Sequence, residues 1–162
     1  MKEKIRVLFI CLGNICRSPA AEGAFKNLVI KTKLDHLFEI DSCGTSGYHD
    51  GELADPRTRK EAENRGISLT HRSRKLTKAD LTYFDYLLVM DENNFQAVSS
   101  LTNEKNIQDK ILLFGKFRSD AGAPIVPDPY YENEVAFKKV QDLVEDCSLG
   151  FLNFLGEIKC LK

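Results

Sequence analysis

The stretch Ile5-Arg-Val-Leu-Phe-Ile-Cys-Leu-Gly-Asn-Ile-Cys-Arg-Ser-Pro19 decides how this chain folds. Its first six residues, 5–10, are almost continuously apolar and rich in β-branched side chains, which is typical of a strand buried on both faces of a parallel sheet. Pro19 suits the first turn of a helix, and apolar residues then recur at helical spacing to about Lys33. The sequence therefore predicts a strand, a tight loop over 11–18 and a helix in direct succession.

The alternation of strands and helices continues along the chain. The further expected elements are strands at 38–42, 86–90 and 111–114, a polar helix at 56–65 that stops at Gly66, a short helix capped by Asp91, an irregular loop at 115–133 and a closing helix from 134 to about 155. Parallel strands need right-handed crossovers, so this order predicts an α/β fold: a doubly wound four-stranded parallel sheet with helices on both faces. Ligands of such sheets bind outside the carboxyl ends of the strands, which directs attention to loop 11–18.

Length and composition place the chain among ordinary globular proteins. With 162 residues, we expect one compact domain over 1–162. Hydrophobic residues make up 43% and charged residues 29%, the balance of a soluble protein. The net charge of −1 gives no overall field that would attract nucleic acid or an anionic membrane. Any affinity for phosphate must therefore be built locally, and no nucleic-acid partner is expected.

No targeting or anchoring segment is recognisable, so we expect a cytoplasmic protein without a membrane anchor. The apolar run 5–12 is interrupted by Arg6 and is too short to span a bilayer. The C-terminal Cys160-Leu161-Lys162 is one residue short of a prenylation box. An odd number of cysteines at irregular spacing predicts reduced thiols, not a disulfide framework or a zinc site. These cysteines are Cys11, Cys16, Cys43, Cys147 and Cys160.

Loop 11–18 carries a cysteine and an arginine separated by five residues, at the end of a strand and the start of a helix. Successive backbone N–H groups can curl around a bound dianion there, and the helix N-terminus adds partial positive charge. Gly13 and Asn14 can take the positive φ that so tight a curl demands. The same potential stabilises Cys11 as a thiolate nucleophile, and the planar fork of Arg17 can hold two phosphoryl oxygens. The expected anion-binding residues are Leu12, Gly13, Asn14, Ile15, Cys16, Arg17 and Ser18.

A bare Cys-x5-Arg pattern is also compatible with a core cysteine, a solvated cation and an ordinary glycine turn. The strand before the loop, the Gly-Asn pair within it and Arg-Ser-Pro at the helix start all favour the anion cradle. In that reading, the Ser18 hydroxyl is placed to donate to the thiolate.

Expulsion of an alkoxide or phenoxide also needs a general acid, and the best candidate is Asp128 in Val126-Pro-Asp-Pro-Tyr-Tyr131. The two prolines hold Asp128 in an extended or turn conformation. Its loop follows the fourth strand and can reach the same sheet edge as loop 11–18. The alternative is an aspartate that only shapes a turn.

Two motifs together resemble one known family. Cys11 to Ser18 followed by Pro19-Ala-Ala-Glu22 is similar to the phosphate-loop signature of the low-molecular-weight protein tyrosine phosphatases, and Asp128-Pro-Tyr-Tyr131 is similar to their acid loop. The resemblance implies a phosphotyrosine phosphatase I-like fold and hydrolysis of phosphotyrosine in a protein substrate. It also implies a phosphocysteine on Cys11, phosphate binding by Arg17 and proton transfer by Asp128, without metal or cofactor.

The resemblance assigns roles to further residues. Asn14, Ser42 and His71 resemble the network that supports the phosphate loop, although Ser42 and His71 are equally well read as a strand-end hydroxyl and a satisfied polar histidine. Cys16 resembles the second loop cysteine, which implies a disulfide with the nucleophile under peroxide. Tyr48, Tyr130 and Tyr131 resemble aromatic walls for an aryl phosphate, with ordinary packing as the alternative for each.

Three other functions are compatible with parts of this pattern. Arsenate reduction on the same fold needs relay cysteines near residues 80–90, but the chain has no cysteine between Cys43 and Cys147. The arginine-phosphate branch of the family resembles this loop with threonine in place of Ile15, and the apolar Ile15 favours an aryl ester. A phosphate-binding module without turnover needs neither nucleophile nor acid, whereas this chain has both Cys11 and Asp128.

Overall fold

A computed structural model describes residues 3–158, so Cys160 and its neighbours lie outside the described residues. Its sheet has four parallel strands in the order β2-β1-β3-β4. The strands are β1 (Ile5–Cys11), β2 (Phe38–Gly44), β3 (Tyr86–Val89) and β4 (Ile111–Leu113). The chain leaves β1 toward β2 on one side and later returns to β3 on the other, so the loop after β1 lies where the strand order reverses. The predicted fold class is confirmed.

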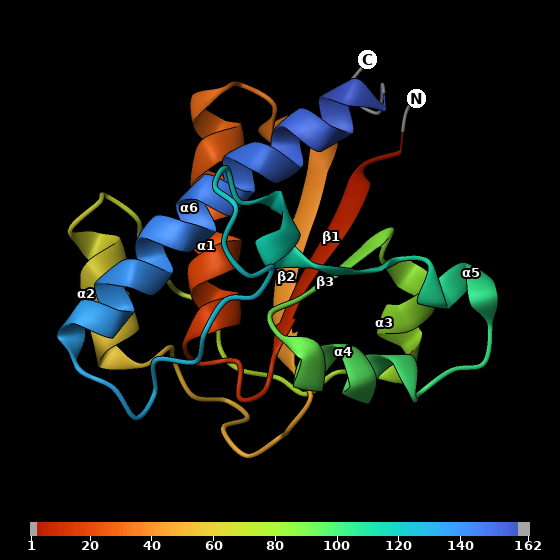
Figure 1. Cartoon of the computed structure of the whole chain (residues 1–162), viewed down its shortest axis with the longest axis horizontal. Helices are drawn as coiled ribbons and strands as arrows, with labels where there is room; N and C mark the ends of the chain where they lie inside the picture. The colour runs from red at the N-terminus through yellow and green to blue at the C-terminus, as the bar shows by residue number, and fades with distance from the viewer. Residues whose placement is uncertain (1–2, 159–162) are drawn as a thin grey trace.

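Helices cover both faces of the sheet, with α1, α2 and α6 on one side and α3, α4 and α5 on the other (Figure 1). The α-helices are α1 (Arg17–Lys31), α2 (Pro56–Glu63), α3 (Lys78–Tyr83), α4 (Glu92–Ser99), α5 (Lys105–Gln108) and α6 (Glu134–Glu157), and the 3-10 turns are η1 (Asp35–Leu37) and η2 (Phe114–Phe117). Strands β1 and β2 run downward in Figure 1, and because all pairs are parallel, the carboxyl ends lie along the same edge of the sheet.

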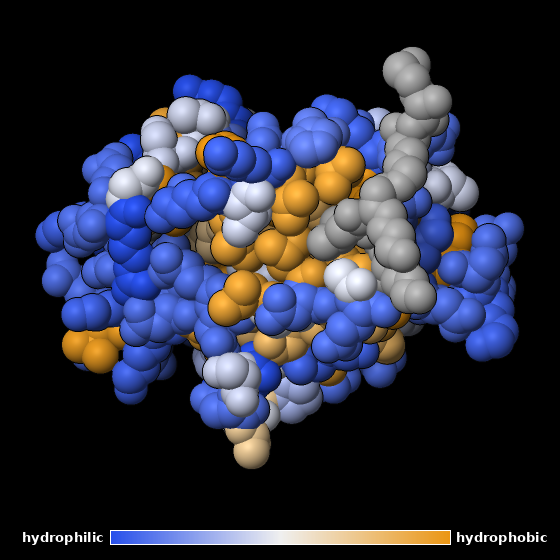
Figure 2. Space-filling model, turned by 90° about the horizontal axis from the view of Figure 1, so that it is seen from above, coloured by the Kyte–Doolittle hydropathy of each residue, from blue (hydrophilic) through white to orange (hydrophobic). Residues whose placement is uncertain are grey.

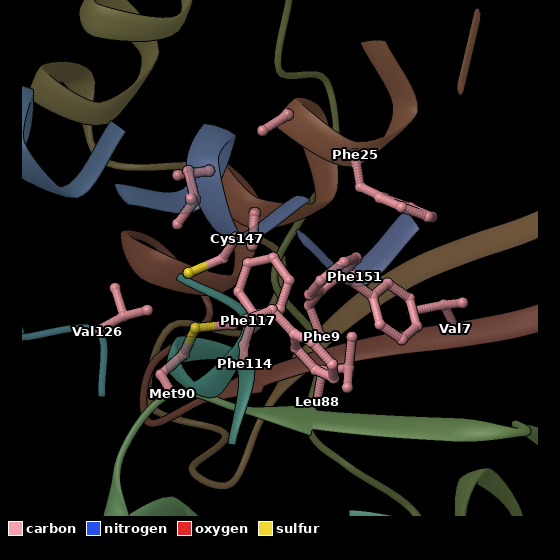
Figure 3. Packing of buried hydrophobic residues seen from close by; sticks show 14 of the residues in the cluster. Val7, Phe9, Phe25, Leu88, Met90, Phe114, Phe117, Val126, Cys147 and Phe151 are labelled. Atoms are coloured by element: carbon pink, nitrogen blue, oxygen red, sulfur yellow. The ribbon is translucent and has the colours of Figure 1, made fainter. Parts of the chain in front are cut away.

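The apolar run of β1 is buried on both faces, as its sequence predicts. Val7 and Phe9 belong to the core under α1 and α6, whereas Leu8 and Ile10 belong to the core under α3, α4 and α5. The larger core is built on aromatic side chains (Figure 3): the Phe9 ring lies 6.0 Å from Phe25 and 5.0 Å from Phe114 in edge-to-face geometry. These contacts fix the lower end of β1, and with it the start of the following loop.

Several predicted boundaries shift for identifiable reasons. Helix α1 ends at Lys31, before the predicted Lys33, because Lys33 adopts a left-handed φ of 61° and Leu34 N–H closes onto Val29 O, as in a Schellman motif. The strand predicted at 111–114 ends at Leu113, where a 3-10 turn begins. Helices α3 and α5 were not predicted, because six and four residues show too little apolar periodicity.

The end of the molecule where the described chain begins and ends lies opposite the loop after β1. Seen from that end, apolar side chains gather in the middle of the surface and hydrophilic side chains surround them (Figure 2).

Within residues 3–158, no helix combines the length and the apolar character needed to cross a membrane.

Candidate active site

Residues 11–18, here called the cradle loop, join the carboxyl end of β1 to the first turn of α1. Of Gly13 and Asn14, only Asn14 takes a positive φ, at 57°. Gly13 is needed for space instead, because a Cβ added there would lie 3.1 Å from the His49 ring. The tight curl therefore depends on an asparagine in the left-handed region and on a glycine packed beneath a histidine.

Three carbonyl groups of the cradle loop are held outward by amides of neighbouring segments. Cys11 O accepts a hydrogen bond from Thr45 N at 2.9 Å, Leu12 O from Ser46 N at 2.9 Å, and Ile15 O from Asp55 N at 2.8 Å. In a trans peptide the C=O and the following N–H point in opposite directions. The amides that follow Leu12 and Ile15 therefore point into the loop, where an anion would accept their hydrogen bonds.

Cys11 lies within this curl and is only 3% exposed. Asn14 N–H donates to its Sγ at 3.3 Å, and Ser18 Oγ lies 3.0 Å from the same atom. Asn14 Nδ2 donates to Ser18 Oγ at 2.7 Å, which leaves the hydrogen of the hydroxyl for the sulfur or for Cys43 O, 3.4 Å away. The sulfur thus has the Asn14 amide and the Ser18 hydroxyl as neighbours, and Ser18 belongs to the first turn of α1.

The side chain of Asn14 is the centre of a buried polar network. Its Nδ2 also donates to Ser42 Oγ at 3.0 Å, and its Oδ1 lies 2.9 Å from His71 Nε2. Ser42 Oγ in turn donates to Glu22 Oε1 at 2.5 Å. The structure therefore brings Ser42 and His71 to the back of the cradle loop, where they fix the strained residue from behind.

Arg17 is 3% exposed, and its guanidinium faces two carboxylates. Nη1 donates to Asp91 Oδ2 at 2.5 Å and to Val126 O at 3.1 Å, while Nη2 lies 3.7 Å from Asp128 Oδ2. Burial by itself lowers the pKa of Arg17, but the adjacent Cys11 and Asp91 outweigh it and hold the pKa above its ordinary value. The guanidinium is therefore a fixed positive charge beside the cradle.

Asp128 reaches the same place from the loop before α6. Its Oδ1 accepts a hydrogen bond from Tyr130 N at 3.1 Å, which is the turn its flanking prolines predict. The loop is attached to the sheet edge through Val126 N, which donates to Met90 O at 2.7 Å. With 43% of its side chain exposed, Asp128 is open to solvent while it faces the Arg17 guanidinium.

One cavity of about 370 Å³ joins these groups. Its walls are Cys11, Leu12, Gly13, Ile15, Cys16, Arg17, Ser46, Tyr48, His49, Asp128, Tyr130 and Tyr131. Cys11 is almost fully buried, whereas Tyr48 and Tyr131 are 84% and 92% exposed, so the sulfur lies at the floor and the tyrosines at the rim. All three tyrosines singled out from the sequence line the cavity, and its flat apolar walls suit an aromatic ring.

Comparison with known proteins relates most of the chain to one protein family. The model of the family described as low molecular weight phosphotyrosine protein phosphatase matches residues 6–159. The chain belongs to this family. A low molecular weight phosphotyrosine protein phosphatase of Schizosaccharomyces pombe is 41% identical over 157 residues, which cover 96% of this chain and 100% of the yeast protein. Its human counterpart is 40% identical over 147 residues, 90% of this chain and 92% of the human protein.

Solved structures agree with the family membership. The crystal structure of a protein tyrosine phosphatase from Entamoeba histolytica with Hepes in the active site has a TM-score of 0.92 and 36% sequence identity. The superposition covers 96% of this chain and 99% of the Entamoeba chain. The four-stranded sheet and its helices are thus those of a low-molecular-weight phosphatase.

Five residues at this phosphatase-family site received no catalytic or binding role from the sequence. Topology could have indicated Asp91, because it follows β3, the neighbour of β1 in the sheet. Glu22 lies one turn after Ser18 in α1 and is 5% exposed. A carboxylate on an otherwise apolar helix face could have indicated such a buried, partnered residue. His49, Arg57 and Ser73 lie in irregular segments or at a helix start, and no sequence pattern points to them.

One group of residues in the described part of the phosphatase offers metal-type ligands. Atoms of Glu22, Asp41 and His71 lie within 4.8 Å of one another. Each already has partners: Lys26 Nζ donates to Glu22 Oε2 at 2.7 Å, Arg74 binds Asp41, and His71 lies against both carboxylates. The group forms the outer layer of the Asn14 network.

Proposed function

We propose that this chain is a protein tyrosine phosphatase that hydrolyses phosphotyrosine in proteins through a phosphocysteine intermediate. The observation that supports this most is the convergence of four groups on one cavity: the Cys11 sulfur, inward-facing amides, the Arg17 guanidinium and the Asp128 carboxyl. Each supplies what displacement at phosphorus requires, namely a nucleophile, charge stabilisation and a proton.

In the first step, the Cys11 thiolate attacks phosphorus and the bond to the phenolic oxygen breaks. Asp128, in its protonated form, gives its proton to the departing oxygen, so tyrosine leaves as a neutral phenol. Arg17 and the cradle amides hold the three equatorial oxygens. In the second step, Asp128 takes a proton from water as that water attacks the phosphocysteine, which releases phosphate and restores the thiolate.

The shape of the cavity supports an aryl ester over an alkyl ester. The sulfur lies at the floor beneath a rim that includes Tyr48 and Tyr131, so the phosphorus must pass the rim before it can react. A phenyl ring holds phosphate well away from the peptide backbone and can pack against the aromatic rim. The single methylene of phosphoserine holds the phosphate too close to the backbone.

The remaining parts of the proposal concern the protein as a whole. The four cysteines in the described part of the chain are free, which supports function in a reducing compartment such as the cytoplasm. Packing of α6 against α1, and of α2 against α6, supports one domain over 1–162. The expected substrate is a phosphotyrosine-containing protein, with no nucleic acid, metal or cofactor involved.

The test is hydrolysis of para-nitrophenyl phosphate, phosphotyrosine, phosphoserine and phosphoarginine, with a chelator present throughout. The matched control is Cys11→Ser, which keeps the size of the side chain and removes the thiolate. Chelator-resistant turnover of the aryl phosphates that is lost in Cys11→Ser supports the proposal. Preferential turnover of phosphoarginine, or activity that survives in Cys11→Ser, would contradict it.

A further inference from the structure

Ser73 lies outside the cradle loop in sequence but touches its backbone. The residue is 5% exposed, and its Oγ donates a hydrogen bond of 2.5 Å to the carbonyl oxygen of Asn14. Its own backbone is fixed on both sides: Ser73 N donates to Glu52 O at 2.8 Å, and Ser73 O accepts from Gly51 N at 2.8 Å. The hydroxyl is therefore held rigidly against the one residue of the loop that has a left-handed backbone.

This hydrogen bond differs from the others that hold the loop carbonyls. The carbonyls of Leu12 and Ile15 accept from backbone amides, which no substitution short of proline removes. In the described chain, Asn14 O is the one cradle carbonyl held by a side-chain donor. Its orientation therefore depends on the identity of the residue at position 73.

The orientation of Asn14 O determines where the next amide points. Because the Asn14–Ile15 peptide is trans, an outward carbonyl turns Ile15 N–H into the cavity. Rotation of this peptide would exchange the two, and an oxygen lone pair would then face the bound phosphoryl group in place of a donor. The hydrogen bond from Ser73 to Asn14 O opposes this rotation of the Asn14–Ile15 peptide, and its loss would make the rotation easier.

We propose that Ser73 is a positioning residue for oxyanion binding: its hydroxyl fixes the Asn14–Ile15 peptide so that Ile15 N–H donates to the phosphoryl dianion. The inference rests on the proposed function, in which the cradle binds a phosphoryl group. Ser73 does not touch the substrate and acts only through the peptide that it holds. A designed or natural variant with alanine here should have a cradle that binds oxyanions less well although every cradle residue is unchanged.

Thermal unfolding of the full chain at increasing concentrations of inorganic phosphate tests this, because stabilisation by a ligand reports its dissociation constant. We expect Ser73→Ala to weaken phosphate binding about tenfold, the size of one well-placed hydrogen bond, and to lower kcat/KM by a similar factor. Ser73→Thr, which keeps the hydroxyl, should restore both. The phosphate-free curves report separately how much each change affects stability.

The matched control is Ser148→Ala. Ser148 is 1% exposed on α6, and its Oγ has no hydrogen-bond partner within residues 3–158. Its removal should leave phosphate affinity and kcat/KM unchanged, so a loss specific to Ser73→Ala is not a general effect of deleting a buried hydroxyl.

Two results would overturn the inference: phosphate affinity in Ser73→Ala equal to that of the parent chain, or an equal loss in Ser73→Ala and Ser73→Thr. Failure of the proposed function has a different signature. In that case the parent chain binds phosphate without turning over an aryl ester, and the comparison of phosphate affinities among the variants still decides the role of Ser73.

Discussion

The Arg17 guanidinium donates to the Asp91 carboxylate at 2.5 Å, and this ion pair joins the carboxyl ends of two neighbouring strands, since Arg17 follows β1 and Asp91 follows β3. Asp91 also caps α4 by accepting a hydrogen bond from Asn94 N with its other oxygen. The carboxylate is therefore fixed before it meets the arginine. The direction in which Arg17 points is thus set by the sheet and not by substrate alone.

We expect Asp91→Asn to lower kcat/KM for an aryl phosphate by about tenfold, because asparagine still caps α4 but no longer holds the guanidinium by charge. Steady-state kinetics measure the change. Asp109→Asn is the control, since Asp109 forms an exposed ion pair with Lys105 far from the cavity. Equal rates for Asp91→Asn and the parent chain would show that Arg17 needs no such support.

Asp128→Asn should lower the rate by a factor on the order of 10²–10⁴, because asparagine cannot donate the proton that the leaving group requires. The loss should be smallest for nitrophenyl esters and largest for esters of weakly acidic phenols. A series of aryl phosphates of graded leaving-group acidity measures this. Asp120→Asn changes an exposed aspartate of the same long loop and serves as the control. A loss that is equal across the series would remove Asp128 from the acid role.

Arg57 attaches the acid loop to α2. Its Nη2 donates to Tyr130 O at 3.1 Å, its Nη1 to Glu132 O at 3.3 Å, and its guanidinium lies 4.2 Å from the centre of the Phe137 ring. We expect Arg57→Ala to release the loop that carries Asp128 and so to reduce turnover of poor leaving groups about tenfold, with phosphate affinity unchanged.

The control for Arg57 is Arg59→Ala in the same helix, whose guanidinium donates to Ala54 O and makes no contact with the acid loop. Leaving-group dependence and phosphate affinity are measured for both variants. Weaker phosphate binding in Arg57→Ala would show that the residue supports the cradle and not the acid loop.

Cys16 should remain a thiol when Cys11 reacts. Burial raises the pKa of Cys16 to about 12, and the nearby Asp55 adds to the shift, so Cys16 is protonated at neutral pH. Mild peroxide should therefore oxidise the Cys11 thiolate to a sulfenic acid first. The Cys16 thiol then closes a disulfide with loss of water, and this step should accelerate as pH rises toward 12. Mass spectrometry of digested protein detects the Cys11–Cys16 link.

Cys147 is the internal control for this oxidation, because burial raises its pKa to about 12 as well and it lies on the buried face of α6. It should stay unmodified in the same sample. Detection of only sulfonic Cys11, without the cross-link and without recovery by a thiol reductant, would contradict reversible inactivation.

Asp80 should make stability depend on pH. Burial alone raises the pKa of this carboxyl, but hydrogen bonds from Arg74 and Thr77 outweigh it, and the net shift is downward. A carboxylate with a lowered folded-state pKa stabilises the fold above its unfolded pKa of about 4, and the contribution is lost as pH falls through the folded value. Urea unfolding should therefore show Asp80→Asn to be less stable than the parent at pH 7, with a smaller difference near pH 3. A difference independent of pH would assign the effect to packing.

The sequence predicted the fold because its decisive signals are local. The apolar run 5–10, the cradle loop and Pro19 follow one another directly, so strand, turn and helix are visible without knowledge of contacts. Short elements such as α3 left no periodicity, and its Thr77 capping box became clear only in the structure.

The residues of the candidate site also fall into those that local motifs indicate and those that only tertiary contacts reveal. Cys11 and Asp128 lie in motifs whose residue types carry the chemistry, so the sequence reveals them. Arg57 and Ser73 act through a guanidinium and a hydroxyl that reach the backbone of segments more than 50 residues away, 73 for Tyr130 and 59 for Asn14. Contacts of this kind depend on tertiary packing, and one sequence contains no pattern that marks them.

The outward-held carbonyls of the cradle loop also limit how far this loop can move relative to the segment that carries Asp128. Thr45 and Ser46, which follow β2, and Asp55, which precedes α2, hold that loop through backbone amides, so it can open only if these segments move with it. The segment that carries Asp128 is attached through the Val126 amide, the Arg57 guanidinium and the packing of Tyr130 against Ile15 and Cys16, so fewer backbone hydrogen bonds oppose its local opening. In the proposed mechanism the nucleophile therefore lies on the more firmly held loop and the proton donor on the loop that opens more easily, which would give phosphate a way out after each cycle.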